Sequence, residues 1–219
     1  ISFPAGNTGA QMGGWFKQKL EGLQSLQGLK MRIPGLGGEV MAQLGVNVQV
    51  LPGGEVYLAL DRGAIDAAEW TGPYDDEKLG FARAARFYYY PGWWEPGPTL
   101  NALVNAKAWN KLPNEYKAIF NTACYEANLT MLSRYDTLNG SALQRLIKSG
   151  TELVAYEEKI LEAAQEASFQ LYADISAKDQ GFRLLFAQWQ KFRDEVSSWN
   201  QVNEFSFSRF TYASRQISL

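Results

Sequence analysis

Residues 28–68 alternate strand-like and helix-like segments, and this order constrains the fold more than any other feature. Strand patterns cover 28–34, 46–51 and 64–68, and helix patterns cover 39–44 and 55–62. One or more glycines lie at each junction. The order strand–helix–strand–helix–strand with short connections predicts an α/β fold with a mainly parallel sheet flanked by helices.

Two charged residues lie at the carboxyl ends of predicted strands in this region. Arg32 ends the first strand and Glu69 follows the third. Ligands of parallel sheets bind beyond these strand ends, so we expect both residues on one edge, at a binding site. The guanidinium of Arg32 is a planar two-pronged donor that matches a carboxylate. The alternative is a solvated charge on an edge strand.

The segment 69–99 concentrates aromatic residues and prolines. It holds three of the 7 Trp and four of the 8 Pro. Rigid amphipathic side chains of this kind line small-molecule pockets, and Trp93, Trp94 and Tyr90 are expected to contact the ligand beyond its carboxylate. The alternative is an aromatic packing corner between two layers.

Composition excludes several classes of function. The chain contains no His, which removes Ser-His-Asp triads, Cys-His dyads and His-ligated metals. The net charge is −2 with no basic run, which argues against nucleic acid binding. No apolar stretch reaches the roughly 18 residues that a membrane span needs. The single Cys124 is expected in a helix core.

Two carboxylates in apolar surroundings, Glu69 and Glu95, need a partner. With the amide oxygens of Gln11 and Asn7 they would suit a hard cation such as Na⁺ or Ca²⁺. The same two carboxylates could form the acid pair of a glycoside hydrolase, and a non-catalytic interaction module is a third possibility. Residue types alone do not separate these readings.

The rest of the chain reads mainly as helix. We expect a short helix or turn at 15–20, a strand at 99–105, one long helix between Pro113 and Gly150, and a brief strand at 151–156. Helices are then expected at 157–178, 182–198 and 199–216. Asp75 and Asp76 are expected in the first turn of a helix. We divide the chain into an α/β core (1–68), a cleft and interdomain-crossing segment (69–105) and a helical remainder (106–219).

Four motifs resemble one known family. They are GNTGAQMGGW at 6–15, GLKMRIPG at 28–35, IDAAEWTGPYDD at 65–76 and YYYPGWWEPGPT at 88–99. Together, and in this order, they are similar to the substrate-binding proteins of TRAP transporters, in the branch that binds 2-oxo and 2-hydroxy acids (the mannitol/chloroaromatic type). The similarity extends over essentially the whole chain.

The resemblance implies a non-enzymatic periplasmic protein with a fold like that of type II periplasmic binding proteins. It implies that the ligand is a small organic acid, such as pyruvate or lactate, delivered to a sodium-driven membrane transporter. Arg32 would clamp the ligand carboxylate. A Na⁺ or Ca²⁺ ion would bridge ligand and protein, held by Gln11, Glu69 and the backbone carbonyl of Trp70.

The predicted ligand-binding set is therefore Arg32, Gln11, Asn7, Trp70 and Glu95. Some family members dimerise by exchanging the C-terminal helix, here expected at 203–216. Full chains of the family are longer by roughly a first domain. We therefore expect this sequence to be a C-terminal fragment that lacks most of that domain and exposes apolar surface meant to contact it.

Overall fold

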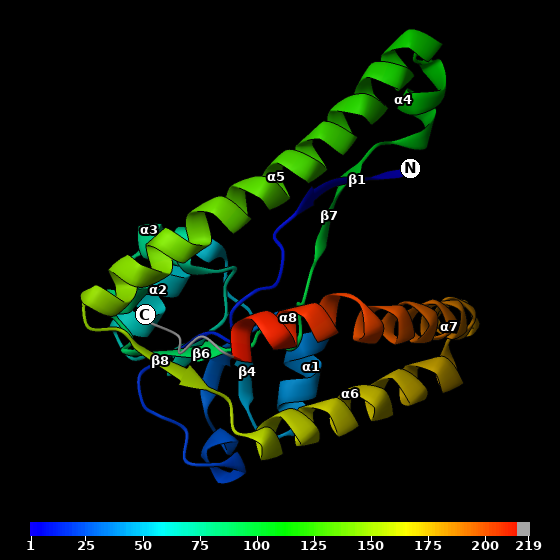
Figure 1. Cartoon of the computed structure of the whole chain (residues 1–219). Helices are drawn as coiled ribbons and strands as arrows, with labels where there is room; N and C mark the ends of the chain where they lie inside the picture. Colours follow the sequence, from blue (N-terminus) through cyan, green and yellow to red (C-terminus); the bar gives the residue numbers. More distant parts are fainter. Residues whose placement is uncertain (214–219) are drawn as a thin grey trace. The chain divides into compact units, whose positions relative to one another are not determined.

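The computed structural model describes residues 1–213. They form two compact units, residues 1–162 and the helical part from residue 163 onward, each described by itself. The elements of Figure 1 are β1 (Ser2–Asn7), β2 (Trp15–Phe16), the 3-10 helix η1 (Leu23–Leu26), β3 (Lys30–Arg32), α1 (Gly35–Gln43), β4 (Asn47–Gln49), α2 (Gly53–Asp61), β5 (Ala67–Ala68), α3 (Pro73–Leu79), η2 (Phe81–Arg83), β6 (Phe87–Tyr90), β7 (Thr99–Leu103), α4 (Ala106–Lys111), α5 (Asn114–Lys148), β8 (Glu152–Ala155), α6 (Glu158–Lys178), α7 (Gln180–Val202) and α8 (Glu204–Ala213).

A six-stranded mixed sheet organises the first unit. Its strand order is β4-β3-β5-β2-β6-β8. β3 pairs in parallel with β4 and β5, and β6 pairs in parallel with β8. The short β2 lies antiparallel between β5 and β6. The parallel pairing of β3 with β4 and β5 confirms the parallel sheet that the strand–helix order of residues 28–68 predicted.

The β2 strand corrects one expectation, because Trp15 and Phe16 were expected in a short helix or turn. Both side chains are fully buried, and each pairs with β5 on one side and β6 on the other. A two-residue strand is too short to show the alternation that predicts a strand. The burial of both side chains between neighbouring strands determines its conformation, and the local sequence does not.

Two apolar cores cover opposite faces of the sheet. Neighbouring residues of one strand point to opposite faces. Phe16, Ala67 and Tyr89 accordingly enter one core, whereas their neighbours Trp15, Ala68 and Tyr88 enter the other. Most of the tyrosines and tryptophans before Pro91 are therefore packing residues, in agreement with the packing-corner reading for that part of 69–99.

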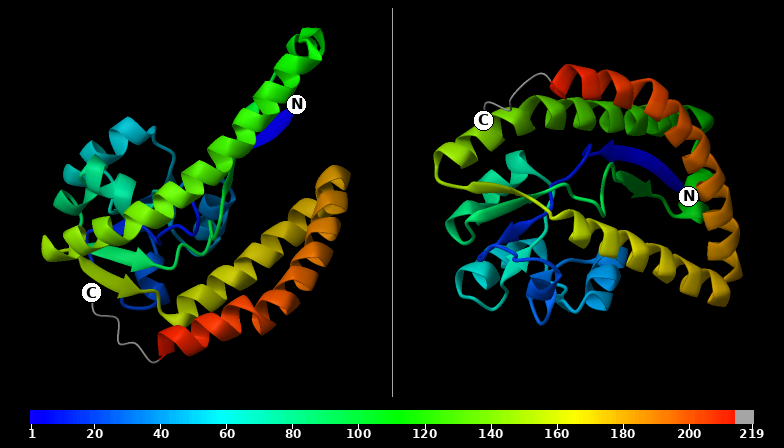
Figure 2. Two further views of the ribbon diagram at one scale, coloured as in Figure 1. Left: turned by 45° about the horizontal axis from the view of Figure 1, so that its top comes forward. Right: turned by 60° about the horizontal axis from the view of Figure 1, so that its bottom comes forward.

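A second, two-stranded sheet pairs the start of the chain with a segment about a hundred residues later. β1 and β7 run antiparallel from Ser2–Leu103 to Asn7–Thr99. The long helix α5 packs along β1 (Figures 1 and 2). A strand was expected at 99–105, where β7 lies, whereas the full extent of β1 was not predicted from the sequence.

The long helix α5 follows the pattern expected from the sequence. It starts after Pro113, carries Glu115 in its first turn and Arg145 and Lys148 in its last, and is followed by Gly150 with φ 103°. These charges match the helix dipole, and a glycine suits the positive φ just beyond a helix end. Cys124 is buried, as expected.

The second unit is built from helices with exposed apolar residues. In α7 and α8 the exposed large side chains are Leu184, Leu185, Trp189, Phe192, Trp199, Val202, Phe205, Phe207, Phe210 and Tyr212. Residues 214–216 of the helix expected at 199–216 lie outside the described residues. Within residues 1–213, no helix combines the length and the apolar character needed to cross a membrane.

Candidate functional site

Arg32 is the last residue of β3, and its side chain is only 11% exposed. Nη1 donates to the carbonyl oxygen of Glu69 (3.0 Å), and Nε donates to the carbonyl oxygen of Leu51 (3.4 Å). The guanidinium also lies 4.9 Å from the ring centroid of Trp70. These contacts fix the guanidinium at the carboxyl-terminal edge of the sheet, so Arg32 is not a solvated edge-strand charge.

Glu69 follows β5 on the same edge. Its backbone N–H donates to the carbonyl oxygen of Arg32 (3.0 Å), and its carboxylate pairs with Arg32 Nη1. Burial raises the pKa of Glu69 to about 7; the charge of Arg32 opposes this rise and that of Glu95 adds to it. A carboxylate this desolvated is stabilised by a second positive charge or by a proton.

Two backbone hydrogen bonds join Gln11 to the segment 92–95, which carries Glu95. Gln11 N donates to the carbonyl oxygen of Glu95 (3.1 Å), and Gly92 N donates to the carbonyl oxygen of Gln11 (3.0 Å). Burial raises the pKa of the Glu95 carboxyl, while the charge of Arg32 and a hydrogen bond from Gln11 lower it. Arg32, Glu69, Glu95 and Gln11 therefore form one electrostatic cluster.

Asn7 has a local role in the structure. Its side-chain oxygen accepts from the backbone N–H of Gly9 (2.8 Å), which closes a turn after β1. Among the described residues, no hydrogen bond joins the Asn7 side chain to Arg32 or Glu69. Its assignment to the ligand stays a prediction.

Three oxygen atoms of these residues are candidates to ligate a bridging Na⁺ or Ca²⁺ ion. Within residues 1–213, no hydrogen bond from protein reaches Glu69 Oε2, Gln11 Oε1 or the carbonyl oxygen of Trp70. No group of three or more His, Cys, Asp or Glu side chains in the described chain could hold a metal. One carboxylate with neutral oxygens is a set that hard cations accept and Zn²⁺ does not favour, so the residues fit.

Asp76 is a buried residue whose environment the sequence did not indicate. It lies in the first turn of α3, as expected, but is 1% exposed. Trp15 Nε1 (2.8 Å) and Tyr88 Oη (2.7 Å) donate to Oδ2, and Gly72 N donates to Oδ1 (3.1 Å). Burial raises the pKa of Asp76 to about 7 against these hydrogen bonds. Through Gly72, this network anchors the loop that carries Glu69 and Trp70.

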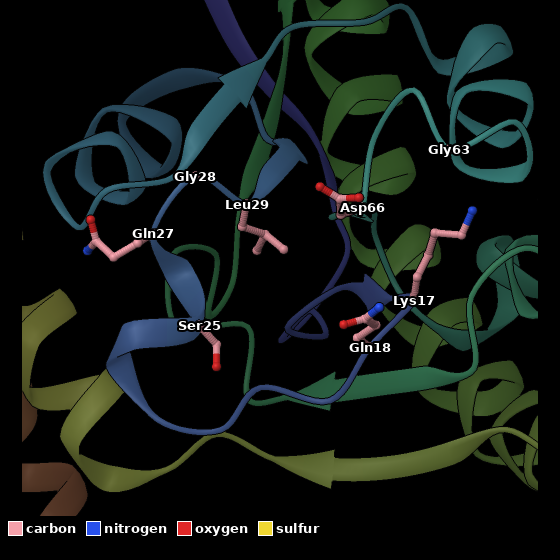
Figure 3. Close-up of a pocket in the computed structure, with 8 residues that line it drawn as sticks. All are labelled: Lys17, Gln18, Ser25, Gln27, Gly28, Leu29, Gly63 and Asp66. Atoms are coloured by element: carbon pink, nitrogen blue, oxygen red, sulfur yellow. The ribbon is translucent and has the colours of Figure 1, made fainter.

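One cavity lies at the opposite edge of the sheet. It has a volume of about 470 Å³ and is lined by Lys17, Gln18, Ser25, Gln27, Gly28, Leu29, Gly63 and Asp66. Figure 3 shows side chains that point in different directions and do not converge. Lys17 Nζ already donates to the carbonyl oxygen of Leu60 (2.7 Å), and Asp66 accepts from Lys30 N (3.0 Å). Since ligands of such sheets bind at the other edge, we assign the site to the Arg32 cluster.

Gly53, the first residue of α2, makes room for the Trp70 ring. A β-carbon on Gly53 would lie 2.5 Å from Cη2 of Trp70, whereas one on Gly54 meets nothing within 4 Å. We expect Gly53→Ala to displace the ring from Arg32 and to destabilise the chain by about 1–3 kcal/mol relative to Gly54→Ala. Both variants change the same helix turn, so equal urea midpoints for the two would contradict the prediction.

Comparison with known proteins decides the family. The sequence profile of "Bacterial extracellular solute-binding protein, family 7" matches residues 1–179. The chain belongs to this family. A relative from Nostoc sp. (strain PCC 7120), named a monocarboxylate 2-oxoacid-binding periplasmic protein, is 63% identical over 215 residues. These residues are 98% of this chain and 59% of that relative, so the chain spans less than two thirds of its length.

Solved structures of TRAP solute binding proteins share the fold. A TRAP transporter solute binding protein from Bordetella bronchiseptica RB50 has a TM-score of 0.95 at 42% identity, over 98% of this chain and 64% of its own; it is a dimer with calcium and picolinate in one site. One from Colwellia psychrerythraea, with bound calcium and pyruvate, has a TM-score of 0.91 at 38% identity, over 94% of this chain and 63% of its own. One from Pseudoalteromonas atlantica T6c, with bound sodium and pyruvate, has a TM-score of 0.91 at 35% identity, over 99% of this chain and 65% of its own. The fold is that of type II periplasmic binding proteins, as expected from the motifs.

Proposed function

We propose that this chain binds a small 2-oxo or 2-hydroxy monocarboxylate together with a Na⁺ or Ca²⁺ ion, as the periplasmic solute receptor of a TRAP-type transporter. The observation that carries the proposal is the buried Arg32–Glu69 pair. Glu69 Oε2, Gln11 Oε1 and the carbonyl oxygen of Trp70 accept no hydrogen bond among the described residues. Relatives with 35–42% identity bind pyruvate or picolinate together with calcium or sodium, which supports the same pairing of anion and cation here.

Arg32 and Glu69 exchange partners in the proposed binding step. In the ligand-free chain the Arg32 guanidinium contacts the Glu69 carboxylate. The ligand carboxylate offers the same planar pair of oxygens and takes over Arg32, which leaves Glu69 free to ligate the ion with Gln11 Oε1 and the Trp70 carbonyl oxygen. A bound ion supplies positive charge between two anions, Glu69 and the ligand, that would otherwise repel each other.

Glu95 has a supporting role at this site. It lies close enough to Glu69 and Arg32 to influence the pKa of Glu69 and to be influenced by Arg32. We assign it to the ligand or to the outer contacts of the ion. A hydrolase that uses Glu69 and Glu95 as an acid pair is not supported, since the relatives are binding proteins, and we propose no enzymatic activity.

The proposed partners are the membrane subunits of the transporter and a second copy of the chain. A dimer formed by exchange of the C-terminal helix would use α8, which is the described part of the helix expected at 203–216. The many exposed aromatic side chains of α7 and α8 support such a contact, because a monomer rarely exposes so many. The relative from Bordetella is also a dimer.

Thermal unfolding tests the proposed function. With Ca²⁺ present, pyruvate at about 100 times its Kd is expected to stabilise the chain by about 2.7 kcal/mol, and so to raise its Tm by roughly 5–10 °C. A chelator in Na⁺-free buffer should remove the shift. Methyl pyruvate, which keeps the 2-oxo group but lacks the charge, is the matched control, and an equal shift with it would refute the arginine clamp.

A further inference from the structure

Asp76 is a buried acid whose charge the proposed function leaves unexplained. It is 1% exposed, and no lysine or arginine among residues 1–213 forms an ion pair with it. Burying a carboxylate without a cation costs free energy, and an apolar side chain of the same shape would fill the space without that cost. The hydrogen bonds of Asp76 are therefore expected to have a role beyond packing.

The three hydrogen bonds to the Asp76 carboxylate divide between its two oxygens. Oδ2 accepts from Trp15 Nε1 (2.8 Å) and Tyr88 Oη (2.7 Å), whose rings stack in the core with centroids 4.0 Å apart. This stacked pair fixes the carboxylate. Oδ1 accepts from Gly72 N (3.1 Å), and Asp76 N donates in return to the carbonyl oxygen of Gly72 (2.9 Å). Gly72 is thus held by Asp76 at both of its backbone polar groups.

The Thr71–Gly72 peptide joins two segments that carry proposed ligands of the ion. Its N–H is the donor to Oδ1, and its carbonyl oxygen accepts from Met12 N (3.3 Å). Trp70 directly precedes this peptide, and Gln11 directly precedes Met12. A peptide unit is planar, so hydrogen bonds at both of its ends fix the orientation of the whole unit. The buried carboxylate therefore acts on both segments through one peptide.

The Trp70 carbonyl lies between two fixed peptides. The preceding peptide is held at the Glu69 carbonyl oxygen, which accepts from Arg32 Nη1 (3.0 Å). The following peptide is held by Met12 and Asp76. The carbonyl oxygen of Trp70 itself accepts no hydrogen bond among residues 1–213, so its direction depends on these neighbours. Without the Asp76 carboxylate, the following peptide would keep one hydrogen bond and would be free to rotate about it.

We propose that Asp76 is a positioning residue for the bridging ion. It fixes the Thr71–Gly72 peptide, and so directs the Trp70 carbonyl oxygen and keeps the Gln11 segment beside it. The inference rests on the proposed function, which names these oxygens as ligands of the ion. Oxygens that are already ordered lose less conformational freedom when a cation binds, so the cation binds more tightly. Removing a group that orients metal ligands typically lowers metal affinity about 10–100-fold.

Calorimetric titration of the metal-stripped chain with Ca²⁺ alone tests this role. Asp76→Ala removes the acceptor of Gly72 N and is expected to weaken Ca²⁺ binding about 10–100-fold. Tyr88→Phe is the matched control, because it removes one donor to Oδ2 and keeps the stacked ring and the Gly72 contact. It is expected to lower the Tm and to leave Ca²⁺ affinity unchanged. Equal losses of affinity in the two variants would show a general loosening of the fold and overturn the role of Asp76.

Pyruvate affinity at saturating Ca²⁺ separates positioning from packing. Arg32 donates to the carbonyl oxygens of Leu51 and Glu69, and neither bond involves Asp76. Once the ion is bound, Asp76→Ala should therefore bind pyruvate about as tightly as the unsubstituted chain does. Loss of pyruvate affinity by the same factor as Ca²⁺ affinity would indicate a disordered site and contradict the proposed role.

Trp15→Phe/Asp76→Asn provides a second route if Asp76→Ala does not fold. With the indole N–H removed, the single asparagine oxygen can accept from Gly72 N while its amide donates to Tyr88 Oη. This double variant lacks the charge and keeps the Gly72 contact, so Ca²⁺ affinity should stay near that of the unsubstituted chain. A loss of about 10-fold or more would overturn the role of the contact.

Two further outcomes separate this inference from the proposed function. Unchanged Ca²⁺ affinity in Asp76→Ala overturns the role of Asp76 and leaves the proposed function intact. Absence of Ca²⁺ binding by the unsubstituted chain would instead overturn the metal site, and this inference with it.

Discussion

Arg32→Ala is expected to abolish stabilisation by pyruvate. The side chain is nearly buried and contacts two backbone carbonyls, a carboxylate and an aromatic ring, so its position is fixed before a ligand arrives. Charge-assisted hydrogen bonds contribute about 1.5–3 kcal/mol each, so losing a bidentate pair should weaken carboxylate binding by at least about 100-fold. Calorimetric titration with pyruvate in the presence of Ca²⁺ measures the effect.

The same substitution should act in the opposite direction on the cation. Without Arg32, Glu69 loses the positive charge that now pairs with it, so Ca²⁺ alone should bind at least as tightly as to the unsubstituted chain above pH 7. Arg32→Lys keeps a charge but not the planar fork, and intermediate pyruvate affinity is expected. Arg62→Ala, at an exposed position at the end of α2, is the control. Equal losses of Ca²⁺ and pyruvate binding in Arg32→Ala would argue against the exchange of partners.

Asp76→Ala is expected to destabilise the chain more than any substitution at the ligand site. It removes the acceptor of two buried side-chain donors, Trp15 Nε1 and Tyr88 Oη, and of the backbone N–H of Gly72. At about 1–3 kcal/mol for each unsatisfied group, the free energy of unfolding should fall by roughly 4 kcal/mol. Asp61→Ala, at an exposed position in α2, should change it by less than about 0.5 kcal/mol. Urea unfolding of both variants provides the comparison.

The pH dependence of stability gives an independent test of the buried carboxyls. Burial raises the pKa of Asp76 in the folded chain to about 7, above its ordinary value of 3.8, and likewise raises the pKa of Glu69 to about 7. The folded chain therefore holds these protons more tightly than the unfolded chain. The stability they contribute is complete below about pH 4 and is lost as the pH rises towards 7. Asp76→Ala should flatten this slope, and an unchanged slope would show that Asp76 is already ionised throughout.

The placement of Arg32 and Glu69 could be predicted because it follows from chain order. Parallel strands joined by short crossovers put their carboxyl ends on one edge, so two residues 37 positions apart meet without any knowledge of side-chain packing. The long helix α5 was readable for a similar reason, since 3–4 spacing between Pro113 and Gly150 is a local signal.

Features that depend on distant partners could not be predicted in the same way. β2 has only two residues, and the pairing of β1 with β7 joins segments about a hundred residues apart. The burial of Asp76 depends on Trp15 and Tyr88, neither of which is near it in sequence, so its position in a helical first turn did not indicate that burial. Gln11 and Glu95 became neighbours through backbone hydrogen bonds that no side-chain pattern encodes. Gln11 itself had been indicated as a metal ligand by its amide oxygen and by the family motifs.

The length of α5 has a mechanical consequence. Its 35 residues form a rod about 50 Å long at the usual rise per residue. One part of this rod packs on α3, whose first turn contains Asp76, and another packs on β1. A rod of this length acts as a lever, because a rotation of a few degrees at α3 becomes a displacement of several ångströms at the far end. Small rearrangements of the loop between Glu69 and α3 would thus be amplified along the β1–β7 ribbon.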